Sequence, residues 1–381
     1  MKIDLNNKYS KKLILSFLER LKELFPEFRF EYENNKLKVK TNKKKISPFQ
    51  IKAIYNAMNI MERLEEKKIF YRSNNKIFYH KDPLPALEKK FEVRRINGGL
   101  FQFHGNFLKV FRSVNNYFYN LAIKKYNATD QENPVLWPVD LYRKIDYFSE
   151  FPHQILMVSG LKKNTKIYKK FSNAYSKNKN YAEIKIGSNF ENSKFGLQPA
   201  VCDNCYYALK NINKFKNTVF TTYNKVFRNE FSEKNSLDRL ISFSVRDIMF
   251  VGTKNFVKST RDDLLNDLKK FFIRSGLNFS IEIANDPFFI GKLNKNIFQQ
   301  SHELKYEILA KIPFLKKSIA IGSINYHLDT FGRAFSIKNK NQFIYSGCIG
   351  VGFERLILAL YSQHGLNIKK WPSKFLKLIK F

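Results

Sequence analysis

The stretch Ser346-Gly-Cys-Ile-Gly-Val-Gly-Phe-Glu-Arg-Leu-Ile-Leu-Ala-Leu360 sets the expected fold of the C-terminal part of the chain. The β-like residues 342–345 lead into it, and we expect this strand to break at Gly347 before an apolar helix that opens with Glu354 and Arg355. Glycines let the backbone approach a neighbour closely. An arginine in a first helical turn can share an anionic ligand with backbone N–H groups. On spacing alone, a strand, a glycine turn and a buried helix without any ligand fit equally well.

An upstream pair of segments has the pattern of a β-hairpin. Residues 226–230 (Val-Phe-Arg-Asn-Glu) are β-like, and residues 239–247 alternate as a second antiparallel strand after a polar loop. Phe-Arg-x-Glu, a loop and Arg-Leu-x-x-Phe resemble motif 2 of the class II aminoacyl-tRNA synthetases. Gly-x-Gly-Phe-Glu-Arg before an apolar helix resembles their motif 3. Both occur here in the family's order.

This resemblance implies a site for ATP. Arg228 would bind the α-phosphate, where negative charge gathers when a carboxylate attacks it and pyrophosphate leaves. Glu230 would accept a hydrogen bond from the adenine amino group, and Phe243 would stack on the adenine ring. Arg355 would cover the other side of the ring or hold the γ-phosphate, so Arg228 and Arg355 are the expected catalytic residues. ATP is expected to carry magnesium, whose ligands the sequence does not identify.

A succession of short segments narrows the family. In chain order they are Tyr147-Phe-x-x-Phe-Pro, Pro199-Ala-x-Cys202, Ala284-Asn-Asp-Pro-Phe-Phe, Asn325-Tyr-His327, Ser346-Gly-Cys348 and Trp371-Pro. Across residues 99–381 this order is similar to the amino acid:[carrier protein] ligases, relatives of the methanogen-type seryl-tRNA synthetase core. Such enzymes convert a small amino acid, here glycine, alanine or serine, into an aminoacyl-adenylate. They then transfer the acyl group to the phosphopantetheine thiol of an acidic carrier protein.

The same resemblance implies a zinc ion that holds the amino group of the substrate. Its ligands fall on Cys202, Asp247 and Cys348, which leaves a fourth position open for the amine. Asp247 departs from the family's glutamate, so a side chain one methylene shorter must reach the metal. Cys205 is an extra thiol that would block the substrate if it became a fourth ligand. The alternative is a set of buried cysteines that bind no metal.

Two further residues are placed in the amino-acid pocket by the resemblance alone. They are Asn325 and His327, in the Asn-Tyr-His segment. For His327 the alternative is a hydrogen-bonded histidine of the protein core.

Composition limits the class of protein. The 381 residues are 44% hydrophobic, contain three cysteines and have no apolar run of membrane-spanning length. We therefore expect a cytoplasmic protein without disulfide bonds. The formal charge of +35 suits an acidic partner. However, lysine accompanied by abundant Asn, Ile, Phe and Tyr is also what an AT-rich genome encodes.

Two domains are predicted. Residues 1–90 would form a small α-β-β-α module and a linker, with helices over 9–25 and from Ser47, a hairpin of 29–32 with 36–39, and a linker over 68–98. Residues 91–381 would form the catalytic domain. The fold class is α+β: a six-stranded antiparallel sheet of the class II synthetase type, flanked by helices.

Partners and alternatives complete the hypothesis. The helix over 107–126 and the proline-punctuated strand over 133–138 resemble motif 1, which implies a homodimer. The second reading is a seryl-type synthetase that charges tRNA, with residues 1–90 as the RNA-binding module. A third reading is a non-catalytic synthetase paralogue, although Arg228, Glu230, Phe243 and Arg355 are all present.

Overall fold

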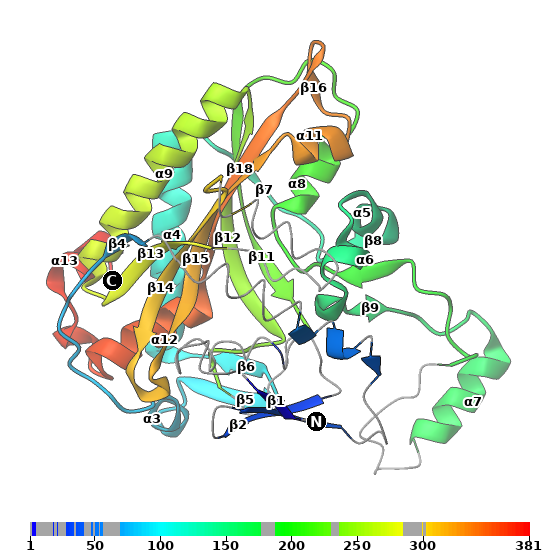
Figure 1. Ribbon diagram of the computed structural model, residues 1–381, viewed down its shortest axis with the longest axis horizontal. Helices are drawn as coiled ribbons and strands as arrows, with labels where there is room; N and C mark the ends of the chain where they lie inside the picture. The colour runs from blue at the N-terminus through cyan, green and yellow to red at the C-terminus, as the bar shows by residue number, and fades with distance from the viewer. Residues whose placement is uncertain are drawn as a thin grey trace.

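An eight-stranded sheet forms the centre of the computed structural model (Figure 1). The structure describes residues 69–381 except 177–186, 230–235, 285–298, 300 and 301, together with residues 2–4, 18, 21, 28–33, 36–41, 47, 48, 50–52, 54 and 55 near the N-terminus. The strand order is β4 (Ile69–Arg72), β13 (Phe279–Ile283), β14 (Lys305–Ile312), β15 (Lys317–Leu328), β18 (Tyr345–Gly352), β12 (Ser242–Gly252), β11 (Thr218–Phe227) and β7 (Thr129–Gln131).

The six inner strands pair antiparallel, as predicted. Two edge strands were not predicted: β4 pairs antiparallel with β13, and β7 pairs parallel with β11. The paired segments of motif 2 are β11 and β12, and they lie beside the motif 3 strand β18. The residues that resemble motifs 2 and 3 therefore meet on adjacent strands.

Helices pack on one face of this sheet. They are α4 (Gly105–Tyr126), α9 (Lys254–Ser275), α12 (Phe353–His364) and α13 (Ser373–Leu378). Figure 1 shows α4 and α9 side by side, and the rings of Tyr117 and Phe271 lie 4.8 Å apart between them. Helix α9 is capped at its start by Thr253, whose side chain accepts a hydrogen bond from the Phe256 backbone N–H, and at its end by Gly276. This face holds the main hydrophobic core.

A smaller apolar cluster lies on the other face, near one end of the sheet. It packs the short helices α8 (Asp203–Ala208) and α11 (Thr330–Ala334) against side chains of β12 and β18. Beside it, β8 (Leu136–Pro138), β10 (Phe195–Leu197) and β9 (Met157–Val158) form a three-stranded sheet. The short elements α5 (Val139–Lys144), α6 (Tyr147–Glu150) and η1 (Pro152–Gln154) lie between β8 and β9 in the chain. This cluster forms one side of the site described below.

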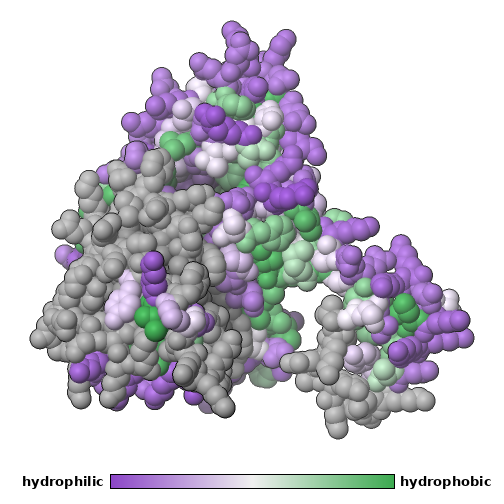
Figure 2. All heavy atoms as spheres, turned by 45° about the vertical axis from the view of Figure 1, so that its right-hand side comes forward, coloured by the Kyte–Doolittle hydropathy of each residue, from purple (hydrophilic) through white to green (hydrophobic). Residues whose placement is uncertain are grey.

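Helix α7 (Thr165–Ser176) stands apart from the central sheet. None of its residues is buried. Figure 2 shows this part of the chain as a separate lobe with mixed hydrophilic and hydrophobic surface. Among the described helices, none is long and apolar enough to cross a membrane.

The predicted N-terminal hairpin is confirmed. Strand β2 (Phe28–Glu33) pairs antiparallel with β3 (Lys36–Thr41), and β1 (Lys2–Asp4) adds a third strand on the other side of β3. Most of the two predicted helices, over 9–25 and after Ser47, lies outside the described residues.

The prediction of a linker over residues 68–98 is wrong for its described part. Residues 69–97 form β4, α3 (Leu84–Lys89) and β5 (Val93–Asn97), and β5 pairs with β6 (Leu100–Phe103). The prolines that suggested a linker instead start a helix: the Asp82 side chain accepts from the Leu84 backbone N–H at 3.0 Å, and proline occupies the first turn. Leu84 and Leu87 then join the main core. The division of the chain at residue 90 stays a prediction.

The expected strand break at Gly347 is also wrong. Strand β18 continues through Gly347 and Gly350 to Gly352, where α12 begins. A Cβ atom at Gly347 would lie 2.6 Å from the Asn325 carbonyl oxygen, and one at Gly350 would lie 2.7 Å from an Asp247 carboxylate oxygen. These glycines therefore permit close packing inside a sheet. The remaining short elements are η3 (Pro313–Leu315), β16 (Lys338–Asn339), β17 (Gln342–Phe343) and η4 (Ile368–Lys370).

Candidate active site

Two cysteines and an aspartate converge at the centre of the sheet. One ligand atom from each of Cys202, Asp247 and Cys348 lies within 4.8 Å of the others, and all three residues are buried. Asp247 on β12 lies opposite Gly350, two residues beyond Cys348 on β18, so both side chains point to the same face. Cys202 approaches from the N-terminus of α8. Because Gly350 has no side chain, the Asp247 carboxylate has room to lie over β18.

The acidic groups of this cluster influence one another strongly. A hydrogen bond from Cys202 is the main cause that holds the pKa of Cys348 well below its ordinary value, and the same bond raises the pKa of Cys202. Burial raises the pKa of Asp247. Asp203, which the sequence reasoning missed, accepts a hydrogen bond from the Cys202 sulfur at 3.5 Å, and burial raises its pKa to about 6. Sulfur and carboxylate donors gathered in a buried place suit a divalent cation such as zinc.

The structure does not bring Cys205 into this cluster. The close group contains Cys202, Asp247 and Cys348, whereas Cys205 packs with aromatic residues of the smaller apolar cluster such as Trp137. Burial raises the pKa of the Cys205 thiol. Among the described residues, the close group therefore offers three ligand atoms.

Asn325 and His327 both contact the sulfur of Cys348. The Asn325 amide donates to this sulfur at 3.5 Å, and the His327 Nε2 atom lies 3.7 Å from it. Asn325 lines the cavity described next, but His327 is not among the described residues that line it. His327 instead packs against Tyr206 and Phe331.

A single cavity of about 220 Å³ connects the cysteine cluster with the residues expected to bind ATP. Its lining includes Cys202, Asp247, Asn325 and Cys348, and also Arg228, Phe243 and Arg355. Phe243 and Asp247 lie four residues apart on β12. The cavity therefore places a candidate metal site beside a candidate nucleotide site.

The two arginines are held by backbone carbonyl groups at the nucleotide end. Arg228 directly follows β11; its guanidinium donates to the Pro199 carbonyl at 3.0 Å and lies 5.5 Å from the ring centre of Phe243. Arg355 lies in the first turn of α12 and donates to the Asp238 carbonyl at 2.8 Å. Glu230 lies outside the described residues.

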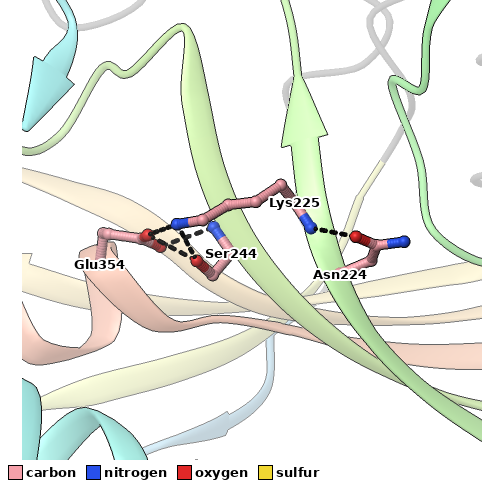
Figure 3. Close-up of polar contacts among 4 residues, drawn as sticks. All are labelled: Asn224, Lys225, Ser244 and Glu354. Carbon is pink, nitrogen blue, oxygen red and sulfur yellow. Dashed lines mark hydrogen bonds and ion pairs between the residues drawn. The ribbon is translucent and has the colours of Figure 1, made fainter. Parts of the chain in front are cut away.

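Glu354 joins motif 3 to motif 2, a contact that the sequence reasoning missed (Figure 3). Its buried carboxylate accepts from the Ser244 backbone N–H at 2.8 Å and from the Ser244 hydroxyl at 2.9 Å. The Lys225 ammonium lies 3.5 Å from the same carboxylate and donates to the Ser244 hydroxyl at 2.6 Å. Figure 3 also shows the Asn224 side-chain oxygen accepting from the Lys225 backbone N–H. This network fixes the start of α12, and with it Arg355, against β12.

A charged pair on β14 also lines the cavity. Lys305 is buried, and its ammonium lies 3.2 Å from the Glu307 carboxylate. Lys305 is opposite Asn325 on β15, and Asn325 is opposite Cys348 on β18, so the three residues form one row across the sheet. This wall could not be found from the sequence, because its place in the cavity depends on the pairing of β14, β15 and β18.

Comparison with known proteins identifies the core. The family described as tRNA synthetase class II core domain (G, H, P, S and T) matches residues 186–364. Residues 186–364 are therefore similar to a class II aminoacyl-tRNA synthetase core. The sheet and its helices also match a solved M. kandleri SerRS, in complex with A. aeolicus tRNASec, with a TM-score of 0.71. That match covers 100% of this chain and 77% of the other at 15% sequence identity, so it shows the fold alone.

Curated relatives of the chain include two groups of ligases. A type-2 serine–tRNA ligase of Methanococcus aeolicus is 28% identical over 317 residues, covering 79% of this chain and 60% of the relative. Amino acid–[acyl-carrier-protein] ligase 1 of Bradyrhizobium diazoefficiens is 33% identical over 151 residues, covering 39% of this chain and 45% of the relative. The chain thus spans about three fifths of the serine–tRNA ligases that it matches and less than half of the carrier-protein ligase. Over these spans the chain is similar to both groups.

Proposed function

We propose that this protein activates glycine, alanine or serine with ATP and transfers the aminoacyl group to the phosphopantetheine thiol of an acidic carrier protein. The observation that carries the proposal is the single cavity shared by the Cys202, Asp247 and Cys348 cluster and by Arg228, Phe243 and Arg355. An amino acid bound at the first group would present its carboxylate to a nucleotide at the second.

The nucleotide end supplies charge stabilisation for adenylate formation. The substrate carboxylate attacks the α-phosphorus of ATP, a new P–O bond forms and pyrophosphate leaves. Arg228 would stabilise the charge that gathers on the α-phosphate, and Phe243 would hold the adenine ring. Arg355 would bind the γ-phosphate or the ring, and Glu354 keeps the helix turn of Arg355 in place. Glu230 would accept from the adenine amino group. ATP is used with magnesium, as in class II synthetases generally.

The metal end fits zinc by the chemistry of its donors. Cys202, Asp247 and Cys348 provide two sulfurs and one carboxylate within reach of one ion. When bound there, zinc would supply a Lewis-acidic anchor for the α-amino group. Asn325 lines the cavity and would limit the space available to the side chain of the substrate. This limit would favour small amino acids.

Serine–tRNA ligase activity is the second candidate. It is supported by the relatives that cover most of this chain, since the match to the M. aeolicus enzyme extends over 79% of it. Both candidates share the adenylation step and differ in the acceptor, a thiol or a ribose hydroxyl. Under either candidate, the segments that resemble motif 1 would form a homodimer.

Aminoacyl transfer decides between the two acceptors. The purified chain, ATP and radiolabelled amino acid would be incubated with holo carrier protein, with the same carrier protein lacking phosphopantetheine, or with total tRNA. Label on the holo form alone supports the carrier-protein reaction. Label on tRNA alone would replace it with the serine–tRNA ligase reaction. Label on neither acceptor, with adenylate formed, would exclude both transfers for these acceptors.

A further inference from the structure

His327 lies behind the Cys348 sulfur in a position that a β-bulge creates. Strand β15 pairs with β18 so that Asn325 faces Cys348 and Tyr326 faces Gly347, but Leu328 is the residue that faces Ser346. His327 is therefore the extra residue of the bulge. Because a bulge redirects side chains, Asn325 and His327 both reach the same sulfur, at 3.5 Å and 3.7 Å.

The other nitrogen of the His327 ring has its own partners. Nδ1 lies 3.3 Å from the Ser346 hydroxyl oxygen and 3.4 Å from the Tyr206 hydroxyl oxygen. The Tyr206 hydroxyl also donates to the Gly347 carbonyl at 3.2 Å, whereas the fully buried Ser346 hydroxyl can donate to Nδ1. In a neutral imidazole one nitrogen accepts and the other donates. A hydroxyl donor at Nδ1 therefore leaves the Nε2 proton directed at Cys348.

Aromatic packing fixes the plane of the ring. Phe331 lies 4.9 Å from His327 at an interplanar angle of 90°, and Phe331 in turn stacks on Tyr206 with centroids 4.3 Å apart. The ring is thus held on one side by aromatic faces and on its edges by polar groups. This environment gives His327 a defined orientation toward the sulfur of Cys348, although His327 is not itself among the described residues that line the cavity.

We propose that His327 is a positioning residue that orients the Cys348 thiolate and reduces its electron donation to the metal through an Nε2–H···S hydrogen bond. This inference rests on the zinc site of the proposed function. It assigns His327 to the support of a metal ligand, whereas Asn325, which lines the cavity, keeps the role of contacting the substrate. Groups that support a ligand in this way typically change metal affinity about 10–100-fold when removed.

The test measures metal binding on the full chain and needs no substrate. Zinc affinity would be determined by competition with a chromophoric chelator, and the sulfur-to-metal charge-transfer band would be recorded with cobalt(II). His327→Ala is expected to weaken zinc binding about 10–100-fold, because the Cys348 sulfur loses a group that holds it in position. The same change should move the band to longer wavelength, because a thiolate without its hydrogen bond donates more strongly to the bound metal. His327→Gln has a side-chain amide that can donate a hydrogen bond to the sulfur. It should therefore restore part of the zinc affinity and part of the band position. His80→Ala, at an exposed histidine, is the matched control and should behave as wild type.

The other possible outcomes distinguish a failure of this inference from a failure of the proposed function. Unchanged zinc affinity and an unchanged cobalt band in His327→Ala would overturn the role of His327 and leave the zinc site intact. A wild-type chain that binds no zinc would remove both. If His327→Ala does not fold, Ser346→Ala removes the hydroxyl at Nδ1 and should still shift the band in the same direction. An unshifted band in Ser346→Ala would then overturn the inference.

Discussion

The two ends of the cavity are built differently. At the metal end, Asp247 and Cys348 lie in the interior of adjacent strands and are buried. At the candidate nucleotide end, Arg228 follows the last residue of β11 and Arg355 lies in the first turn of α12, and both are held through carbonyl groups of other segments. Sheet register therefore fixes Asp247 and Cys348, whereas Cys202, Arg228 and Arg355 are positioned at the ends of elements. This difference predicts that small steric changes affect metal binding most, while loss of charge affects adenylation most.

The largest effect is expected at the nucleotide end. Arg228→Ala should lower ATP–pyrophosphate exchange by at least about 10²-fold, because the charge that develops on the α-phosphate loses its main partner. Its zinc content and thermal unfolding should stay close to wild type. Arg143→Ala, at an exposed arginine, is the matched control. Near-normal exchange in Arg228→Ala would remove the motif 2 assignment.

Loss of the Cys348 sulfur should affect the metal end of the cavity. Cys348→Ser should reduce bound zinc well below one ion per chain, measured by elemental analysis after dialysis, because a hydroxyl is a poor zinc ligand at neutral pH. Cys205→Ser changes a cysteine that is equally buried but outside the cluster, and it should keep its zinc. Equal zinc in both variants would contradict the ligand set.

An added methyl group at Gly350 should affect the metal end of the cavity. In Gly350→Ala the new Cβ would lie 2.7 Å from the Asp247 carboxylate oxygen, so the carboxylate must move. We expect weaker zinc binding and a loss of about 1–3 kcal/mol in the free energy of unfolding. Gly160→Ala meets no atom within 4 Å and should change neither quantity. Wild-type zinc affinity in Gly350→Ala would mean that the position of Asp247 does not control the metal.

The smallest effect is a pH dependence at Glu354. Burial raises the pKa of this carboxyl above its ordinary value of 4.5, so the folded protein binds this proton more tightly than the unfolded chain does. The raised pKa of Glu354 contributes fully to the free energy of unfolding below pH 4.5, and this contribution is lost as pH rises through the pKa of the folded state. Each unit of increase corresponds to about 1.4 kcal/mol. The unfolding free energy of wild type relative to Glu354→Gln, measured with urea, should therefore fall with rising pH; a constant or rising difference would contradict the assignment.

Local patterns predicted much of the architecture and the site. The alternating segments of motif 2 and the helix after Gly352 follow from short stretches of sequence, whereas Cys202, Asp247 and Cys348 were identified by the resemblance to the family. The break at Gly347 was wrong because a glycine looks the same in a turn and in a tightly packed strand. The linker prediction over residues 68–98 was wrong for a similar reason: the prolines near Asp82 are compatible both with a linker and with the first turn of a helix.

The missed features depend on the pairing of distant segments. Glu354 contacts Ser244, and nothing near either residue in the sequence indicates that α12 begins beside β12. The orientation of His327 depends on a bulge whose register is visible only when β15 and β18 are paired. The wall formed by Lys305 and Glu307 likewise requires the strand order of the whole sheet.

ATP–pyrophosphate exchange with each of the standard amino acids, with zinc content determined on the same preparation, tests the proposed function most directly. We predict exchange only with glycine, alanine or serine, and about one zinc ion per chain. Exchange with none of the amino acids would contradict the proposal and favour a non-catalytic synthetase paralogue, with the shorter ligand Asp247 as the first residue to examine.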